Sequence, residues 1–442
     1  MSEFVVLLSV PGLRASDLAH MPNLAALTAH GDRAPLVASF PALTCPVQVN
    51  MTTGLPPKEH GVVANGIFWR DTQRVEMWTC GNHVVKRPQL WERLHEHDAT
   101  ITSAAWFPLF IKKAYADLIC TPAPIHNPDG SESLWCYTKP EELYGELRDA
   151  LGHFPLMNFW GPLAGIKSTA WIVSSALWTA ERRRPNFWYI YLPHLDYAAQ
   201  KFGPDSPQAI AACAELDAEL GRLSAGFTAT YAEHKLLWLV ASEYAITPVE
   251  RVSYPNRVLR EAGLLGVKVD DDGREELDFT TSAAWALADH QLAQIFVRDN
   301  DKRVIAQVVD LFSREPCVAE VLDRAGQAKY EIDHYRNADV VLASTPDSWF
   351  AYYWWNDDTQ APIYARTVDI HRKPGYDSVE LFFDPATKGI PLDATLVRGS
   401  HGAPPREESQ RGVLLCNQRG VFIERTMADV DVAEIVLRQF GV

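Results

Sequence analysis

Short apolar runs alternate along the chain with longer stretches in which apolar residues recur at helical spacing. Five of these runs have the length and the continuous apolar character of buried strands. They are Phe4–Val10, Ile101–Trp106, Phe187–Leu192, Leu236–Ala241 and Gly412–Cys416. Residues 90–97 and 208–223 show helical spacing of Ala, Leu and Ile. Strands that are apolar on both faces and alternate with helices predict an α/β fold, in which helices flank a largely parallel sheet.

The character of the sequence changes after about Pro255. An acidic, turn-rich piece, Asp270-Asp271-Asp272-Gly273, indicates an exposed loop. Between this loop and about Asp369 the chain contains elements of its own. The pattern predicts strands at 294–297 and 340–343 and a helix at 302–312. We therefore expect a smaller α+β cap over residues 270–369, inserted into a core formed by residues 1–269 and 370–442.

Composition and charge limit the kinds of partner. A hydrophobic content of 47% and 14 Trp residues indicate a sizeable folded interior rather than a disordered chain. The formal net charge of −15 argues against nucleic acid or an anionic membrane surface as a partner, because either would be repelled. A local basic pocket for a small anion is compatible with this charge.

The cysteines and the N-terminal run bear on the compartment. Seven cysteines are scattered without a CxxC pair, which fits a reducing cytoplasm better than a disulfide framework. The first apolar run has no basic leader and ends early, at Pro11-Gly12. No apolar stretch has the length of a transmembrane span. We expect a cytoplasmic protein, and the oligomeric state is not readable from the sequence.

The segment Phe40-Pro41-Ala42-Leu43-Thr44-Cys45-Pro46 predicts a hydroxyl group at the start of a short helix. Pro46 suits the first helical turn, where its missing N–H is of no consequence. The free N–H groups and the dipole of that turn favour a bound anion. With metal ions to lower its pKa, Thr44 could attack a phosphoryl group. The alternative is that Thr44 is an ordinary N-cap residue.

Several motifs follow one another in a familiar order. The first strand is followed by Pro11-Gly12-Leu13-Arg14, then by the Thr44 segment, and then by His60-Gly61 and Asn65-Gly66. This order resembles the alkaline phosphatase superfamily, most closely its nucleotide pyrophosphatase/phosphodiesterase branch. The likeness returns at residues 191–204, 240–244 and 399–402, and so spans nearly the whole chain. It implies an alkaline phosphatase-like core and hydrolysis of a phosphodiester, a pyrophosphate or a monoester by a Thr44 nucleophile.

The resemblance also implies a centre of two divalent metal ions. At three of the ligand positions that the resemblance implies, this chain has a residue type that binds metal ions. These residues are Asp196, Glu243 and His401. Gln200, through its amide oxygen, and His371 are further candidate ligands. His194, Asp369 and His290 are possible replacements. Ligands of these types suit zinc, manganese or magnesium, and we expect zinc or manganese in less than the complete two-metal site.

This chain departs from the family pattern at four positions. Pro11, Gln200 and Tyr244 stand where the resemblance places an Asp and two His ligands. Val47 replaces an Asn that supports the phosphate, although Gln48 follows directly. These departures mark either lost or altered chemistry.

Four side chains are candidates for binding the substrate anion. Besides Gln48, Asn65 stands in the position of a family residue near the phosphate, and its amide could donate a hydrogen bond to a phosphoryl oxygen. The alternative is that Asn65-Gly66 forms a tight turn. Arg372 and Lys373, beside His371, would supply cations for the anion. The alternative for this cluster is a solvated basic loop.

Two main functions remain open, besides a third possibility, the transfer of a phosphoryl group to an acceptor other than water. The first is a metal-dependent hydrolase of phosphate esters that acts on a small phosphorylated metabolite through Thr44. The alternative is a catalytically degenerate member of the superfamily that binds such a metabolite or regulates a partner protein. Affinity for the ligand without turnover would favour the alternative.

Overall fold

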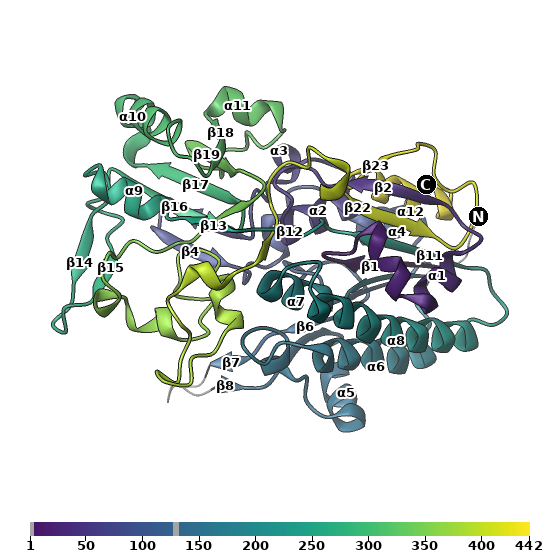
Figure 1. Ribbon diagram of the computed structural model, residues 1–442. Coiled ribbons are helices and arrows are strands. Elements are labelled where there is room, and N and C mark those ends of the chain that lie inside the picture. The colour runs from purple at the N-terminus through teal and green to yellow at the C-terminus, as the bar shows by residue number, and fades with distance from the viewer. Residues whose placement is uncertain (1–3, 127–131) are drawn as a thin grey trace.

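The computed structural model describes residues 4–126 and 132–442 (Figure 1). Its largest sheet has nine strands. They are β1 (Phe4–Val10), β2 (Arg33–Val37), β5 (Ser103–Trp106), β6 (Leu118–Pro122), β9 (Cys136–Lys139), β10 (Phe187–Tyr191), β11 (Leu236–Ser242), β22 (Gly412–Cys416) and β23 (Met427–Ala428). In space their order is β23-β2-β22-β11-β1-β10-β5-β6-β9. The five strands from β11 to β6 are parallel, and β22 and β9 flank them in antiparallel orientation. The predicted α/β fold with a largely parallel sheet is confirmed.

Two groups of helices pack on this sheet (Figure 1). One group contains α1 (Pro22–Thr28), α6 (Ile166–Arg183), α7 (His194–Phe202) and α8 (Pro207–Thr230). The other contains α2 (Thr44–Thr53), α4 (Leu90–His97) and α12 (Asp431–Phe440). Because β10 and nearly all of β1 and β11 are buried on both faces, helices are needed on each side. Within the described ranges, no helix combines the length and the apolar character needed to cross a membrane.

A second sheet of four antiparallel strands lies between residues 284 and 344. Its order is β16-β17-β19-β18. The strands are β16 (Ala284–Asp289), β17 (Leu292–Val297), β18 (Val318–Leu322) and β19 (Val340–Ser344). Helix α10 (Lys302–Phe312), which packs on β18 and β19, has the predicted bounds.

The bounds of the cap stay a prediction. The apolar cluster around the second sheet continues past the expected limits, to Val249 on one side and Val397 on the other. It also includes Phe40 and Leu43, which directly precede α2. Residues 1–3 and 127–131 of the predicted core lie outside the described residues.

The carboxyl ends of the central strands meet at one edge of the large sheet. The register places Ser9 of β1 beside Tyr191 of β10 and Ala241 of β11. Residues that follow parallel strands gather at this edge, which is where α/β proteins bind ligands. Glu243 and Tyr244 directly follow β11, and α7 begins shortly after β10. The edge therefore carries the residues of the candidate site.

Truncation of a side chain in the central strand tests this architecture. Leu8 of β1 lies between β10 and β11 and has no exposed surface. We expect Leu8→Ala to lower the free energy of unfolding by about 2–5 kcal/mol, because it leaves a cavity in a packed core. Leu163→Ala, at a side chain that is 63% exposed, is the control and should change stability by at most about 0.5 kcal/mol. Urea denaturation followed by circular dichroism measures both, and equal losses would contradict the central place of β1.

Candidate active site

Helix α2 places the Thr44 hydroxyl inside the site. Leu43 is the N-cap residue and Thr44 is the first helical residue, so the prediction of a hydroxyl at a helix start is confirmed. Every residue of α2 is buried. The Oγ1 atom of Thr44 lies 3.0 Å from the phenol oxygen of Tyr244. Thr44 therefore directs its hydroxyl to another side chain, and its interpretation as an N-cap is wrong.

Two of the N–H groups in the first turn of α2 have partners within the protein. The amide of Cys45 donates to Oδ1 of Asn65 at 2.9 Å, and the amide of Val47 donates to the carbonyl of Leu43 at 3.0 Å. Pro46 has no N–H. The helix start consequently has fewer amides for an anion than the sequence suggested.

Tyr244 connects Thr44 to Asp196. The phenol donates to Oδ2 of Asp196 at 3.3 Å. Since its single proton is directed there, the Thr44 hydroxyl is the donor in the other hydrogen bond. The ring of Tyr244 stacks on the imidazole of His401, with 3.5 Å between centroids and 5° between planes. Tyr244 thereby holds three of the predicted site residues, Thr44, Asp196 and His401, in one cluster.

Two buried carboxyl groups lie in this cluster. Oε1 of Glu243 accepts hydrogen bonds from Oγ of Ser9 at 2.6 Å and from Nε2 of Gln48 at 2.8 Å. Burial raises the pKa of Glu243 to about 8 and that of Asp196 to about 7. The second oxygen of each group is buried and has no hydrogen-bond partner. Both groups therefore favour their protonated forms more than exposed carboxyl groups do.

Four aromatic side chains form a stack through the site, which we call the ring stack: Tyr244, His401, His290 and Tyr376. His401 and His290 are 4.0 Å apart between centroids, and His290 and Tyr376 are 3.6 Å apart. The Tyr376 phenol donates to Oε1 of Gln200 at 2.8 Å. Burial lowers the pKa of both histidines well below the usual value, so both imidazoles are neutral.

A hairpin of the second sheet delivers His290 to the ring stack. Strand β16 ends at Asp289 and β17 begins at Leu292, so His290 and Gln291 form the connecting loop. The φ angle of His290 is 59°, a conformation that residues other than Gly rarely adopt and that functional sites retain. Nδ1 of His290 lies 2.7 Å from Oδ1 of Asp289. This contact fixes the orientation of the imidazole.

Asn65 joins α2 to the same hairpin. While its Oδ1 accepts from Cys45, its backbone N–H and its Nδ2 donate to the two oxygens of Asp289, each at 3.1 Å. Burial raises the pKa of Asp289 to about 6. Both amide atoms of Asn65 are thus engaged within the protein.

The structure brings together most of the predicted site residues. Those in the connected network are Thr44, Gln48, Asn65, Asp196, Gln200, Glu243 and His401. The basic cluster at 371–373 has a different environment. His371 and Arg372 are exposed, and Arg372 pairs with Asp369. Lys373 is buried, with Nζ 2.9 Å from Oδ2 of Asp377 and 2.6 Å from Oε1 of Glu380.

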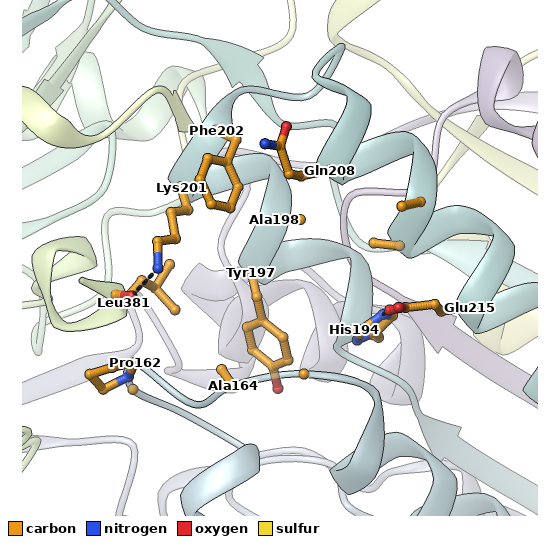
Figure 2. A pocket seen from close by; sticks show the side chains of 14 residues that line it. Pro162, Ala164, His194, Tyr197, Ala198, Lys201, Phe202, Gln208, Glu215 and Leu381 are labelled. Carbon is orange, nitrogen blue, oxygen red and sulfur yellow. Dashed lines mark hydrogen bonds and ion pairs between the residues drawn. The ribbon is translucent and has the colours of Figure 1, made fainter. Parts of the chain in front are cut away.

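A cavity of about 310 Å³ lies on the outer side of α7, away from this network (Figure 2). His194 lines it, and Nε2 of that residue is 2.7 Å from Oε2 of Glu215 on α8. Lys201 extends along the same side and donates to the carbonyl of Leu381 at 2.9 Å. Helix α7 therefore has two polar sides, and His194 lies on the side opposite Asp196.

Comparison with known proteins identifies the family of this chain. Residues 5–377 match the family described as type I phosphodiesterase/nucleotide pyrophosphatase. The chain belongs to this family. A phosphodiesterase-family relative, an uncharacterised pyrophosphatase/phosphodiesterase of Schizosaccharomyces pombe, is 25% identical over 250 residues. That match covers 55% of this chain and spans 45% of the relative's length.

Solved structures show the same fold. Phosphonoacetate hydrolase of Sinorhizobium meliloti, in complex with phosphonoformate, has a TM-score of 0.64 at 15% identity and covers 99% of this chain and 96% of its own. Human ectonucleotide pyrophosphatase/phosphodiesterase 5 has a TM-score of 0.63 at 14% identity, with 99% and 95% covered. The murine form of that protein, an inactive threonine-to-alanine variant in complex with AMP, has a TM-score of 0.63 at 14% identity and covers 100% of this chain and 95% of its own. The alkaline phosphatase-like core is thereby confirmed.

Members of the phosphodiesterase family are generally metalloenzymes. The residues of this site therefore have to be compared with the requirements of a metal ion. Among the residues that the structure describes, no three or more His, Cys, Asp or Glu side chains converge on one point. The phenol of Tyr244 lies between Thr44 and Asp196, and its ring covers one face of His401. The amide oxygen of Gln200 accepts from both Tyr376 and Ser378. This donor set does not fit the metal centre of the phosphodiesterase family.

Sequence reasoning did not single out three residues of the site. Ser9 is the one polar residue in the apolar run of β1, and a lone hydroxyl in a buried strand was a usable signal. Asp289 ends the apolar strand β16 directly before His290, and this adjacency was also visible. Tyr376 gave no signal, since its partner Gln200 is far away in the sequence.

The raised pKa of Glu243 predicts how stability depends on pH. The folded protein keeps this proton up to about pH 8, whereas the unfolded chain releases it at the ordinary value near 4.5. The unfolded state therefore binds fewer protons across this window, and the free energy of unfolding falls as pH rises. Relative to Glu243→Gln, which carries no such proton, the parent should lose up to about 1.4 kcal/mol per pH unit. Urea denaturation across the window measures both proteins, and parallel curves would contradict the raised pKa.

Substitution of Lys373 separates a structural role from substrate binding. We expect Lys373→Met to lower the free energy of unfolding by about 3–5 kcal/mol, because it leaves two buried carboxylates without a cation. Arg372→Met, at a side chain that is 57% exposed, is the control and should cost at most about 1 kcal/mol. Thermal and urea denaturation measure both variants. Unchanged stability with lost ligand affinity in Lys373→Met would instead support its predicted contact with the substrate.

Proposed function

We propose that this protein hydrolyses a phosphate ester, namely a phosphodiester, pyrophosphate or monoester of a small phosphorylated metabolite, with Thr44 as the nucleophile. The observation that carries this proposal is the hydrogen-bond chain from Thr44 through Tyr244 to Asp196, with distances of 3.0 and 3.3 Å. A threonine hydroxyl is a weak nucleophile unless a base removes its proton. The chain offers that base at a carboxyl group.

The first step follows from this arrangement. Oγ1 of Thr44 forms a bond to phosphorus while the bond from phosphorus to the leaving oxygen breaks. The Thr44 proton moves to the Tyr244 oxygen as the phenol proton moves to Oδ2 of Asp196. In the second step a water oxygen attacks the same phosphorus and the bond to Oγ1 breaks. The proton then returns from Asp196 through Tyr244 to Thr44, and the water proton leaves with the products.

Binding of the phosphoryl group requires an exchange of hydrogen bonds. Thr44 is only 2% exposed, so a substrate has to displace side chains that surround it. The amide groups of Gln48 and Asn65 donate to Glu243 and Asp289 and lie on the same network as Thr44. We propose that these two amides turn to the phosphoryl oxygens. Arg372 and Lys373 stay predictions for the anion, subject to the stability test above.

Features of related proteins support the proposal. The murine structural neighbour is an inactive threonine-to-alanine variant and binds AMP, and the Sinorhizobium meliloti neighbour binds phosphonoformate. Both ligands carry a phosphoryl or phosphonyl group. The resemblance implies a zinc or manganese ion, and no step above passes through one. All seven cysteines are free thiols, which supports the proposed cytoplasmic location.

A specific observation favours a second candidate, a protein that binds a phosphorylated metabolite without hydrolysis. Tyr244 and Gln200 stand where the resemblance places metal ligands, and both make hydrogen bonds within the protein. Such a protein would keep affinity for AMP or a similar ligand and would show no turnover.

Substitution of Thr44 tests the two candidates. We expect Thr44→Ala to reduce kcat/KM for a nitrophenyl phosphodiester or monoester by about 10³-fold or more, since it removes the nucleophile. Thr44→Ser keeps a hydroxyl group and should retain measurable turnover. Calorimetric titration with AMP is the control, because binding should survive in both variants. Full turnover in Thr44→Ala would contradict the proposed nucleophile, and AMP binding without turnover in the parent would favour the second candidate.

A further inference from the structure

The ring stack occupies the middle of the candidate site. Its four rings are in successive contact, with centroid distances of 3.5, 4.0 and 3.6 Å from Tyr244 through His401 and His290 to Tyr376. Three of the rings are at most 2% exposed. Tyr244 follows a central strand of the large sheet, and His290 comes from the second sheet. The ring stack therefore joins the two sheets across the site.

Each end of the ring stack carries a hydroxyl group that forms a hydrogen bond with a residue predicted to be a metal ligand. At one end the Tyr244 phenol binds Thr44 and Asp196. At the other end the Tyr376 phenol binds Gln200, which lies one helical turn after Asp196 on α7. A phenol thus links the proposed nucleophile to a carboxyl group.

The remaining ligand atoms do not converge on a site for a resident metal ion. Nδ1 of His401 donates to the carbonyl of Ala42 at 2.8 Å, which leaves Nε2 as its lone-pair nitrogen. Nε2 of His401 and Oδ1 of Asp196 are buried and have no hydrogen-bond partner. Oε1 of Glu243 accepts from Ser9 and Gln48, and its Oε2 is also buried without a partner. Sites that hold zinc use three or four protein ligands. This network contains the imidazoles of His401 and His290 and several carboxyl groups, but among the described residues no three such side chains converge on one point.

We infer that the ring stack takes the place of the metal centre, so that this protein works at its phosphate-ester site without a resident divalent cation. In this arrangement the Tyr244 phenol orients the Thr44 hydroxyl and passes its proton to Asp196. The catalytic part of the inference rests on the proposed function. The absence of a resident cation is a separate claim about binding.

Metal binding is measured first, on the full chain purified without chelator. Elemental analysis should find no zinc or manganese above the level of a control protein. Titration with Co²⁺ should give no absorption bands of a protein-bound ion, and added Zn²⁺ or Mn²⁺ should not shift the melting temperature. One or more ions per chain, lost in both Asp196→Ala and His401→Ala, would overturn the inference.

Two variants test whether the ring stack is the reason that the protein binds no divalent cation. The double variant Gln200→His with Tyr244→His restores two imidazoles at the positions where the resemblance places them, and it should gain Co²⁺ absorption that Asp196→Ala abolishes. Tyr244→Phe is the matched control, because it keeps the ring on His401 and removes only the hydroxyl. It should bind no metal and should lose turnover. Metal uptake by Tyr244→Phe alone would contradict the inference, and the parent measurement decides if the double variant does not fold.

Turnover with and without chelator separates this inference from the proposed function. Hydrolysis by the parent that is unchanged within about twofold after treatment with EDTA supports both. Hydrolysis that requires a bound cation overturns the inference and leaves the proposed function intact. No hydrolysis together with no bound cation overturns the proposed function and leaves the claim about cation binding intact.

Discussion

The contact between Tyr244 and His401 is the interaction on which the site depends. It links the end of β11 to the segment after β21 (Gly399–Ser400), more than 150 residues later in the chain. The imidazole in turn contacts His290, so the same contact fixes how the β16–β17 hairpin meets the large sheet. Three carboxyl groups, those of Asp196, Glu243 and Asp289, are buried beside these rings. Buried charge is costly without compensation, and hydroxyl and amide donors provide that compensation here.

Polar groups in this interior serve two purposes at once. Asn65 accepts a hydrogen bond from the amide of Cys45, the second residue of α2, and donates to Asp289. One side chain therefore fixes both the helix that carries Thr44 and the hairpin that carries His290. Gln48 similarly binds Glu243 and accepts from the amide of Leu109. Networks of this kind stabilise one arrangement strongly when every member has a partner. Four of the buried side-chain atoms without partners belong to residues of this network, namely Asp196, Glu243, Gln200 and His401, which makes it the place where we expect a ligand to be accommodated.

Local pattern predicted much of the fold and part of the site. The bounds of β1, β22, α4 and α10 agree with the expectation because buried runs and helical spacing are properties of adjacent residues. The position of Thr44 at the start of a helix was predicted for the same reason. Contacts such as Gln200 with Tyr376 were not readable, since they depend on tertiary packing. The segment at 371–373 read as a source of free cations, although Asp377 and Glu380 lie only four and seven residues after Lys373. The burial of Lys373 with these two carboxyl groups follows from the fold of the loop and not from the local pattern.

The position of β22 has a consequence for biosynthesis. This strand, at residues 412–416, lies between β2 and β11 and pairs with both. Until it has left the ribosome, β2 has no neighbour that connects it to the parallel strands, and one edge of β11 is unpaired. Exposed strand edges recruit other chains, and pairing across such sequence separations is slow. The large sheet is therefore completed only after residues 412–416 have been translated, and any product truncated before residue 412 retains an open edge in its central sheet.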